Sequence, residues 1–203
     1  MKKSLLALIL AVAMVVPAFA AKGDNSIDVK VGLGVNSNIA ISGITGEMSG
    51  GDDTFMGFKT DMPFMLGADF FYEAIDNLSI GVGANYVFNT SAKGEMSEYK
   101  GGTTNIYVAV KPEAKLDSDI FTSLYLIGQL GLSLGRTDLP EEMSSVDCKS
   151  GIYLGAGFGT TIKDVVFVEL IFSSCNGELK YGPMSVDIQY SITSVNVGYK
   201  FAL

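Results

Sequence analysis

The chain has 203 residues, of which 48% are hydrophobic and only 18% are charged, a composition typical of one ordered, apolar domain. It contains no histidine, which excludes every histidine-dependent catalytic base, triad and metal site. Its 14 basic and 22 acidic residues give a net charge of −8, so we expect no surface that binds nucleic acid.

The N-terminus has the three parts of a secretory signal peptide. Lysines at positions 2 and 3 form a short positive region, residues 5–16 form an apolar run, and Ala18-Phe19-Ala20 is a small-residue cleavage motif. The run is too short for a transmembrane helix, which needs about 20 apolar residues. We therefore predict a signal peptide over residues 1–20 and a mature domain over residues 21–203.

The rest of the chain alternates between apolar residues and small or polar ones with a period of two, which is typical of strands with two unlike faces. In the first such segment Ile27, Val29 and Val31 are apolar, whereas Asp28 and Lys30 between them are charged. Eight segments follow this pattern, at about 27–35, 64–73, 78–88, 105–111, 124–134, 152–159, 166–173 and 194–203.

The connections between these segments alternate in length. Short turns lie near 75–77, 116–119 and 163–164, and long loops lie at about 36–61, 90–102, 135–150 and 175–190. Short turns at one end and long loops at the other are typical of an up-and-down meander, which eight strands are enough to close. The sequence therefore predicts an all-β fold, an eight-stranded antiparallel up-and-down barrel.

Alternation alone does not say which face of the barrel points outward, and a soluble lipocalin-like barrel is the alternative to a membrane barrel. The less apolar face is mostly glycine, serine, asparagine and threonine, which suits the narrow interior of an eight-stranded barrel. Its charges are mixed in sign and are predicted to pair as a network in the lumen: Asp28, Lys30, Asp69, Glu73, Lys111, Glu113, Lys115, Glu169 and Lys200.

Aromatic residues on the apolar face gather near the strand ends. Four lie toward the long loops and four toward the short turns: Phe64, Tyr86, Phe88 and Phe172, then Phe70, Tyr72, Tyr199 and Phe201. Two such belts mark the two interfaces of a membrane. We therefore predict a transmembrane β-barrel whose apolar face contacts lipid.

The chain resembles the small eight-stranded outer-membrane barrels of the OmpA and OmpX kind. The resemblance covers residues 24–203 by architecture, and its most specific element is the last strand, at 194–203. In that family the barrel-assembly machinery reads a final strand that normally closes on Phe, and Tyr199, Phe201 and Leu203 stand in this place here. The resemblance implies location in the cell outer membrane, with outer-membrane lipid and the assembly machinery as partners.

No motif for catalysis or for a cofactor stands out. Related barrels that are acyltransferases or proteases use histidine, and the mixed lumen charges are better explained as structural ion pairs than as a Ser–Lys or paired-carboxylate site. Acidic loop clusters at 52–53 and 138–147 lack calcium-loop spacing, and whether they bind Ca²⁺ or Mg²⁺ stays open. We expect a non-enzymatic barrel whose extracellular loops serve surface or ligand interaction and envelope structure. The alternative is a narrow porin or a carrier of small hydrophobic solutes.

Three finer predictions follow. Cys148 and Cys175 are expected to form a disulfide, because both lie near one rim in an oxidising compartment. The apolar phase changes from even to odd positions along 186–201, which predicts a β-bulge near Thr193-Ser194 or an extension of 184–192 above the membrane. The lumen is expected to be closed to ions.

Overall fold

A computed structural model describes residues 25–45, 56–59, 62–94, 97–138, 147–181 and 184–203. Eight long strands form the fold: β1 (Asn25–Thr45), β3 (Phe64–Ile75), β4 (Leu78–Gly94), β5 (Ser97–Lys115), β6 (Phe121–Asp138), β8 (Gly151–Ile162), β9 (Val166–Tyr181) and β10 (Met184–Ala202). Two short strands, β2 (Met56–Lys59) and β7 (Asp147–Lys149), pair with β1 and β9. No helix among the described residues is long and apolar enough to cross a membrane.

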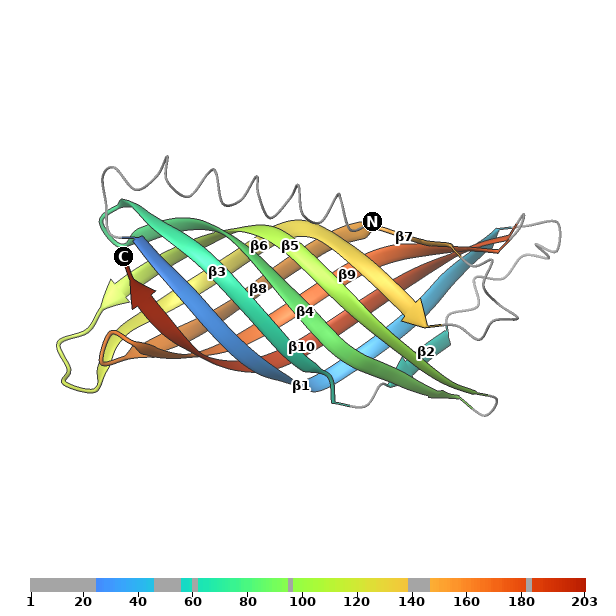
Figure 1. Ribbon diagram of the computed structural model, residues 1–203, viewed down its shortest axis with the longest axis horizontal. Coiled ribbons are helices and arrows are strands. Elements are labelled where there is room, and N and C mark those ends of the chain that lie inside the picture. The colour runs from blue at the N-terminus through green and yellow to red at the C-terminus, as the bar shows by residue number, and fades with distance from the viewer. Residues whose placement is uncertain (1–24, 46–55, 60–61, 95–96, 139–146, 182–183) are drawn as a thin grey trace.

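The eight long strands close into a barrel in which every neighbouring pair is antiparallel, and this confirms the predicted fold. Each strand pairs with the next along the chain, and β10 returns to pair with β1. The register followed once around the barrel from Asp28 comes back to β1 at Ile39, so the strands are strongly staggered. Figure 1 shows the resulting tilt, with the strands winding obliquely around the long axis.

The two ends of the barrel differ as the loop lengths predict. At one end the turns are tight, and the left-handed φ angles of Asn77 (65°), Lys163 (50°) and Asp164 (61°) let the chain reverse at once. The C-terminus lies at this end, and β2 and β7 lie toward the other (Figure 1). There β1 runs on to Thr45, well past its last pairing with β3 at Leu33.

The apolar face of the barrel wall points outward and the less apolar face points into the lumen, as predicted. On β1 the side chain of Leu33 is 54% exposed, whereas that of Lys30 is 5% exposed and points into the barrel. The aromatic belts also form contacts of their own on the outer face. Ring centroids lie 5.6 Å apart for Phe64 and Phe88 in the upper belt, and 4.7 Å apart for Tyr199 and Phe201 in the lower belt.

The interior is layered, and of the two alternatives predicted for 186–201 the bulge on β10 is wrong, whereas an extension of 184–192 beyond the upper belt agrees with the pairing of Phe172 with Thr193. β10 pairs regularly with β9 from Met184 to Tyr199, so no bulge interrupts it at Thr193-Ser194. Instead Tyr190 and Ile192 stay on the lumen face, buried with Met65 and Val87 in an apolar cluster. The phase change was misinterpreted because apolar residues were assigned only to the lipid face, whereas the upper lumen is apolar too.

A register shift does occur at this level, but on the neighbouring strand. Gly34 pairs with Ser194 and Asn36 pairs with Thr193, so Val35 is the extra residue. A bulge of this kind bends the strand that carries it and increases its twist. The bulge therefore lies on β1 at the height where one was expected on β10.

Candidate functional site

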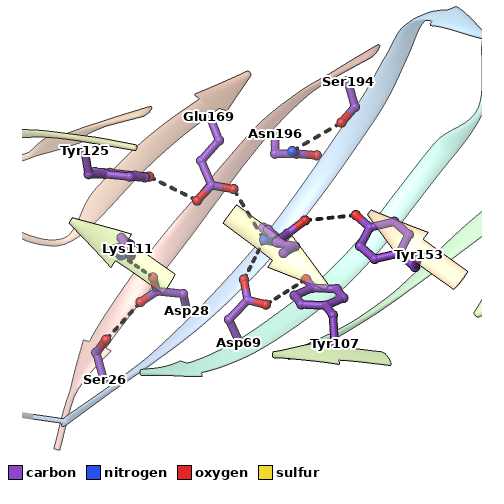
Figure 2. A network of polar contacts seen from close by, with 12 residues as sticks. Ser26, Asp28, Asp69, Tyr107, Lys111, Tyr125, Tyr153, Glu169, Ser194 and Asn196 are labelled. Carbon is purple, nitrogen blue, oxygen red and sulfur yellow. Dashed lines mark hydrogen bonds and ion pairs between the residues drawn. The ribbon is translucent and has the colours of Figure 1, made fainter. Parts of the chain in front are cut away.

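Lys30 is the hub of a polar network in the half of the lumen nearer the tight turns. Its ammonium lies 2.5 Å from Asp69 Oδ2 on β3 and 3.3 Å from Glu169 Oε2 on β9. The three side chains are almost completely buried. Figure 2 shows the carboxylates of Asp69 and Glu169 in this network. Lys30 thereby ties together three strands of the wall.

Two tyrosines supply the carboxylates with further hydrogen bonds. Tyr107 donates its hydroxyl to Asp69 Oδ1 at 2.7 Å, and Tyr125 donates to Glu169 Oε1 at 3.1 Å (Figure 2). Each carboxylate thus has the Lys30 ammonium as a charged partner and a tyrosine hydroxyl as a neutral hydrogen-bond donor, as a buried charge requires. Because the tyrosines stand on β5 and β6, the network reaches most of the barrel circumference.

A second ion pair lies beside the first. Lys111 on β5 donates to Asp28 Oδ2 on β1 at 3.0 Å, and the Ser26 hydroxyl donates to the other oxygen of Asp28 at 3.3 Å (Figure 2). The Lys111 ammonium also lies 4.4 Å from the ring centroid of Phe71 and 4.6 Å from that of Tyr125. A cation between two aromatic faces and a carboxylate is held in place rather than left free to move.

The geometry of this network is that of a structural cross-link. A Ser–Lys nucleophile would need the serine hydroxyl to face the lysine nitrogen, but Ser26 donates to Asp28 instead. Both lysines are engaged by carboxylates of other strands: Lys30 by Asp69 of the neighbouring β3 and by Glu169 of β9, and Lys111 by Asp28 of β1. Among the described residues, no group of three or more cysteine, aspartate or glutamate side chains could hold a metal ion. The acidic loop residues at 52–53 and 141–142 lie outside the described part of the chain.

The structure divides the predicted lumen charges into two groups. Five form the buried network just described: Asp28, Lys30, Asp69, Lys111 and Glu169. The other four line a cavity of about 580 Å³ at the mouth beside the tight turns: Glu73, Glu113, Lys115 and Lys200. There Glu73 accepts a hydrogen bond of 3.1 Å from the backbone N–H of Asn77, so it supports the turn between β3 and β4.

The alternation also predicts that the neutral residues Tyr125, Gln129 and Tyr153 point inward, and the structure confirms this and adds their partners. Tyr153 donates to Gln129 at 2.9 Å, and its ring stacks on that of Tyr107 at 5.3 Å between centroids. Asn105 donates its amide to Asn85 at 2.7 Å. The alternation places these residues on the inward face, where a buried tyrosine or asparagine must find a polar partner.

The cysteines do not face each other in this arrangement. Cys175 is a free thiol on β9 and pairs in register with Tyr153 and Tyr190. Cys148 on β7 pairs with Leu179, four residues further along β9, and its side chain lies outside the described part. Four residues of a strand extend about 13 Å, and a disulfide needs Cα atoms within about 7 Å. The disulfide stays a prediction, and forming it requires β7 to slide along β9.

A closed barrel with an apolar, belted exterior and a polar core in its lumen is an integral β-barrel of an outer membrane. The chain belongs to the family described as outer membrane protein beta-barrel domain, whose model matches residues 5–201. This confirms the predicted family resemblance and the location in the outer membrane. No curated protein matches the sequence at a significant level.

Two solved structures illustrate the likeness in fold. Neisserial surface protein A is 12% identical with a TM-score of 0.52, and the match covers 89% of this chain and 100% of that one. The outer membrane protein OprG from Pseudomonas aeruginosa is 16% identical with a TM-score of 0.50, and the match covers 88% of this chain and 96% of that one. At these identities the likeness shows the fold alone.

Proposed function

We propose that the protein is a non-enzymatic scaffold whose sealed barrel raises a loop-bearing rim outside the cell, for contacts with surfaces or ligands and for envelope structure. This proposal rests on the length of β-strand that extends beyond the upper aromatic belt. β1 pairs at Leu33 with Phe64 of that belt and then continues to Thr45. A membrane strand needs only about 9–11 residues, so this extension stands in the outer aqueous phase.

The same surplus occurs on other strands. β4 and β5 stay paired as far as Gly94 and Ser97, and β9 and β10 stay paired as far as Tyr181 and Met184. Paired strands form a stiff wall, and connections mounted on a stiff wall are suited to recognition. The buried network below supports the non-conducting part of the proposal, because its ion pairs and aromatic rings are buried inside the lumen, in the half nearer the tight turns.

The experiment separates the rim from the barrel. Cells producing the full chain are compared with cells in which residues 46–55 and 139–146 are replaced by short glycine-serine linkers, and adhesion to cultured epithelial cells and to abiotic surfaces is measured. The trimmed barrel should stay in the outer membrane and lose adhesion, whereas unchanged adhesion would contradict the role of the rim. Liposomes containing the wild-type protein should resist swelling in small sugars, and rapid swelling would contradict the sealed lumen.

A carrier of small hydrophobic solutes is the second candidate, and the apolar upper lumen favours it. Met65, Val87, Tyr190 and Ile192 form an apolar floor on the outer side of the polar network. A hydrophobic solute could rest on such a floor, whereas an ion could not. Faster entry of a fluorescent naphthylamine into cells that produce the protein, abolished by Val87→Asp, would favour the carrier over the scaffold.

The end of β10 supports the proposal that the assembly machinery is a partner. Tyr199, Phe201 and Leu203 all lie exposed on the outer side. In the closed barrel this strand is paired with β1, where Tyr199 faces Val29 and Phe201 faces Ile27. We infer that it is read before closure, when its edge is still free. Slower membrane assembly of a Phe201→Ser variant, measured by pulse-chase gel shift, is the expected result.

A further inference from the structure

The cavity of about 580 Å³ at the mouth beside the tight turns contains two glutamates, Glu73 on β3 and Glu113 on β5. Neither of them forms an ion pair with any residue in the described part of the chain. Both strands meet the turn at Asn77. Glu73 accepts a hydrogen bond from the backbone N–H of Asn77, and the backbone N–H of Glu113 donates to the carbonyl oxygen of Asn77 at 2.8 Å. The two glutamates therefore lie on either side of the same turn.

A third acceptor at this mouth is buried without a donor. The side chain of Asn25, the first residue of β1, lines the cavity and is 7% exposed. Its Oδ1 atom has no hydrogen-bond partner among the described residues. Buried polar atoms are normally paired, so this oxygen points to a donor from outside the described part of the chain. Asn25 pairs in register with Tyr72, so the orphaned oxygen and Glu73 lie on adjacent strands.

The segment that precedes β1 is within reach of these acceptors. Cleavage after Ala20, as predicted, leaves residues 21–24, with the sequence Ala-Lys-Gly-Asp, ahead of Asn25. These four residues lie outside the described part of the chain. Four extended residues span about 13 Å, and neighbouring strands lie about 4.8 Å apart. The first residue of the segment can therefore reach Glu73, one strand away, and Glu113, three strands away.

The register favours a segment that leaves the sheet over one that lengthens β1. Continued by one residue past the pair of Asn25 and Tyr72, the ladder between β1 and β3 would place Asp24 opposite Glu73. Like charges directly opposite each other destabilise a sheet. Gly23 comes next, and glycine has the conformational freedom to reverse the chain at once. The sequence before β1 thus has both a reason to leave the ladder and a residue at which to turn.

We propose that the mature N-terminus folds into this cavity, with the α-ammonium of Ala21 bound between Glu73 and Glu113. The proposal rests on the predicted cleavage, because only cleavage creates this charge. The ammonium has donors for both carboxylates, and the backbone N–H groups of the turning segment supply a donor for Asn25 Oδ1. The chain thereby fills its own mouth on the tight-turn side of the buried network.

The attachment at Asn25 favours this segment over a diffusible ligand. The cavity has charges of both signs, since it is also lined by Lys115, Lys200 and Asp164. Its net charge alone therefore selects no guest. A segment tethered by a short linker is present at an effective concentration in the millimolar range. It occupies the site ahead of a free amine or amino acid of similar intrinsic affinity.

Acetylation of the purified, folded protein by an N-hydroxysuccinimide ester at neutral pH tests the proposal. Peptide mass spectrometry follows the rate at Ala21, which is divided by the rate of the free peptide Ala-Lys-Gly-Asp in the same sample. The ratio should be about tenfold lower for the folded wild-type protein than for the protein unfolded in urea, because an ammonium held by two carboxylates keeps its proton and does not attack the reagent. Glu73→Gln/Glu113→Gln should raise the folded ratio about fivefold, and glutamine still accepts the hydrogen bond from Asn77.

The matched control is Asp164→Asn, which removes a carboxylate of the same cavity from the turn between β8 and β9. Asparagine tolerates the left-handed φ of 61° at this position, and the ratio should not change. Gel migration without heating verifies that each variant folds. Equal ratios for folded and unfolded wild-type protein, an equal rise in Asp164→Asn, or an intact mass that includes residues 1–20 would overturn the proposal. Protection that disappears on exhaustive dialysis would also overturn it, because the occupant would then be a diffusible ligand.

Discussion

Replacing Lys30 with methionine removes the one positive charge that two buried carboxylates share. Methionine fills similar space, so the change deletes the charge while nearly preserving the packing. Asp69 and Glu169 would then each keep a tyrosine hydroxyl as donor but lose the ammonium at 2.5 Å and 3.3 Å. Breaking a buried ion pair by removing one partner costs about 3–5 kcal/mol, and we expect a loss of unfolding free energy in this range.

Urea titration of the protein in lipid vesicles measures this loss. The folded and unfolded fractions are read from gel migration without heating, since the chain has no tryptophan to report unfolding. Titrations are run in both directions, so that the free energies are equilibrium values. Lys115→Met at the exposed mouth is the matched control, and it should change the stability by no more than about 0.5 kcal/mol.

A triple variant separates lost charge pairing from lost packing. Lys30→Met with Asp69→Asn and Glu169→Gln removes all three charges and leaves their shapes nearly unchanged, so it should recover most of the stability that Lys30→Met loses. A loss below about 1 kcal/mol in the single variant would contradict the reasoning. So would a triple variant that is as unstable as the single one.

Three further predictions use other parts of the chain. Gly131→Ala should destabilise the barrel strongly, because a Cβ there would overlap the backbone of β5. A Cβ at Gly135 on the same strand meets nothing within 4 Å, so Gly135→Ala should leave the free energy of unfolding unchanged in the same titration. Thiol labelling of denatured, unreduced protein should find no free thiol, as expected if β7 slides along β9 to join Cys148 to Cys175, and two reactive thiols would refute the disulfide. The intact mass of the envelope form should correspond to cleavage after Ala20, and a mass that includes residues 1–20 would refute the signal peptide.

The outer face of the barrel could be predicted from the sequence because lipid imposes a simple rule on it. Every outward residue between the belts must be apolar, so Val29, Val31 and Leu33 identify the phase of β1, and the other strands follow in the same way. The alternation of tight turns and long loops then orders the strands. Neither inference needs any contact between distant residues, and this is why both were correct.

The site was predictable only in part because its residues find their partners on other strands of the closed barrel. The phase of the alternation shows that Lys30 and Glu169 point inward, but they are 139 residues apart and lie on different strands. Which carboxylate meets which lysine depends on the stagger of the closed barrel. Sequence alone therefore identified the charged residues of the lumen and could not divide them between the buried network and the mouth.

In the upper lumen the alternation pattern gave a wrong prediction for a different reason. Tyr190 and Ile192 are apolar and face inward, so the rule for lipid assigned them to the wrong side. Period two reports only that two faces differ, and it carries no information where both faces are apolar. The bulge at Val35 on β1 was hidden in the same way, because an extra residue in one strand is visible only against the register of its neighbour.

The position of the Lys30–Glu169 pair gives the network a role in closing the barrel. β9 and β1 are separated by β10, and β10 meets β1 only when the two ends of the sheet join. Before that moment Lys30 and Glu169 are held apart at the two ends of the open sheet, whereas Asp69 on the neighbouring β3 already lies beside Lys30. Closure removes water from both charges and brings them together at once, so the ion pair stabilises the closed state and no open intermediate. The buried ion pair between Lys30 and Glu169 therefore favours the closed barrel. We expect its loss to weaken first the pairing between β10 and β1.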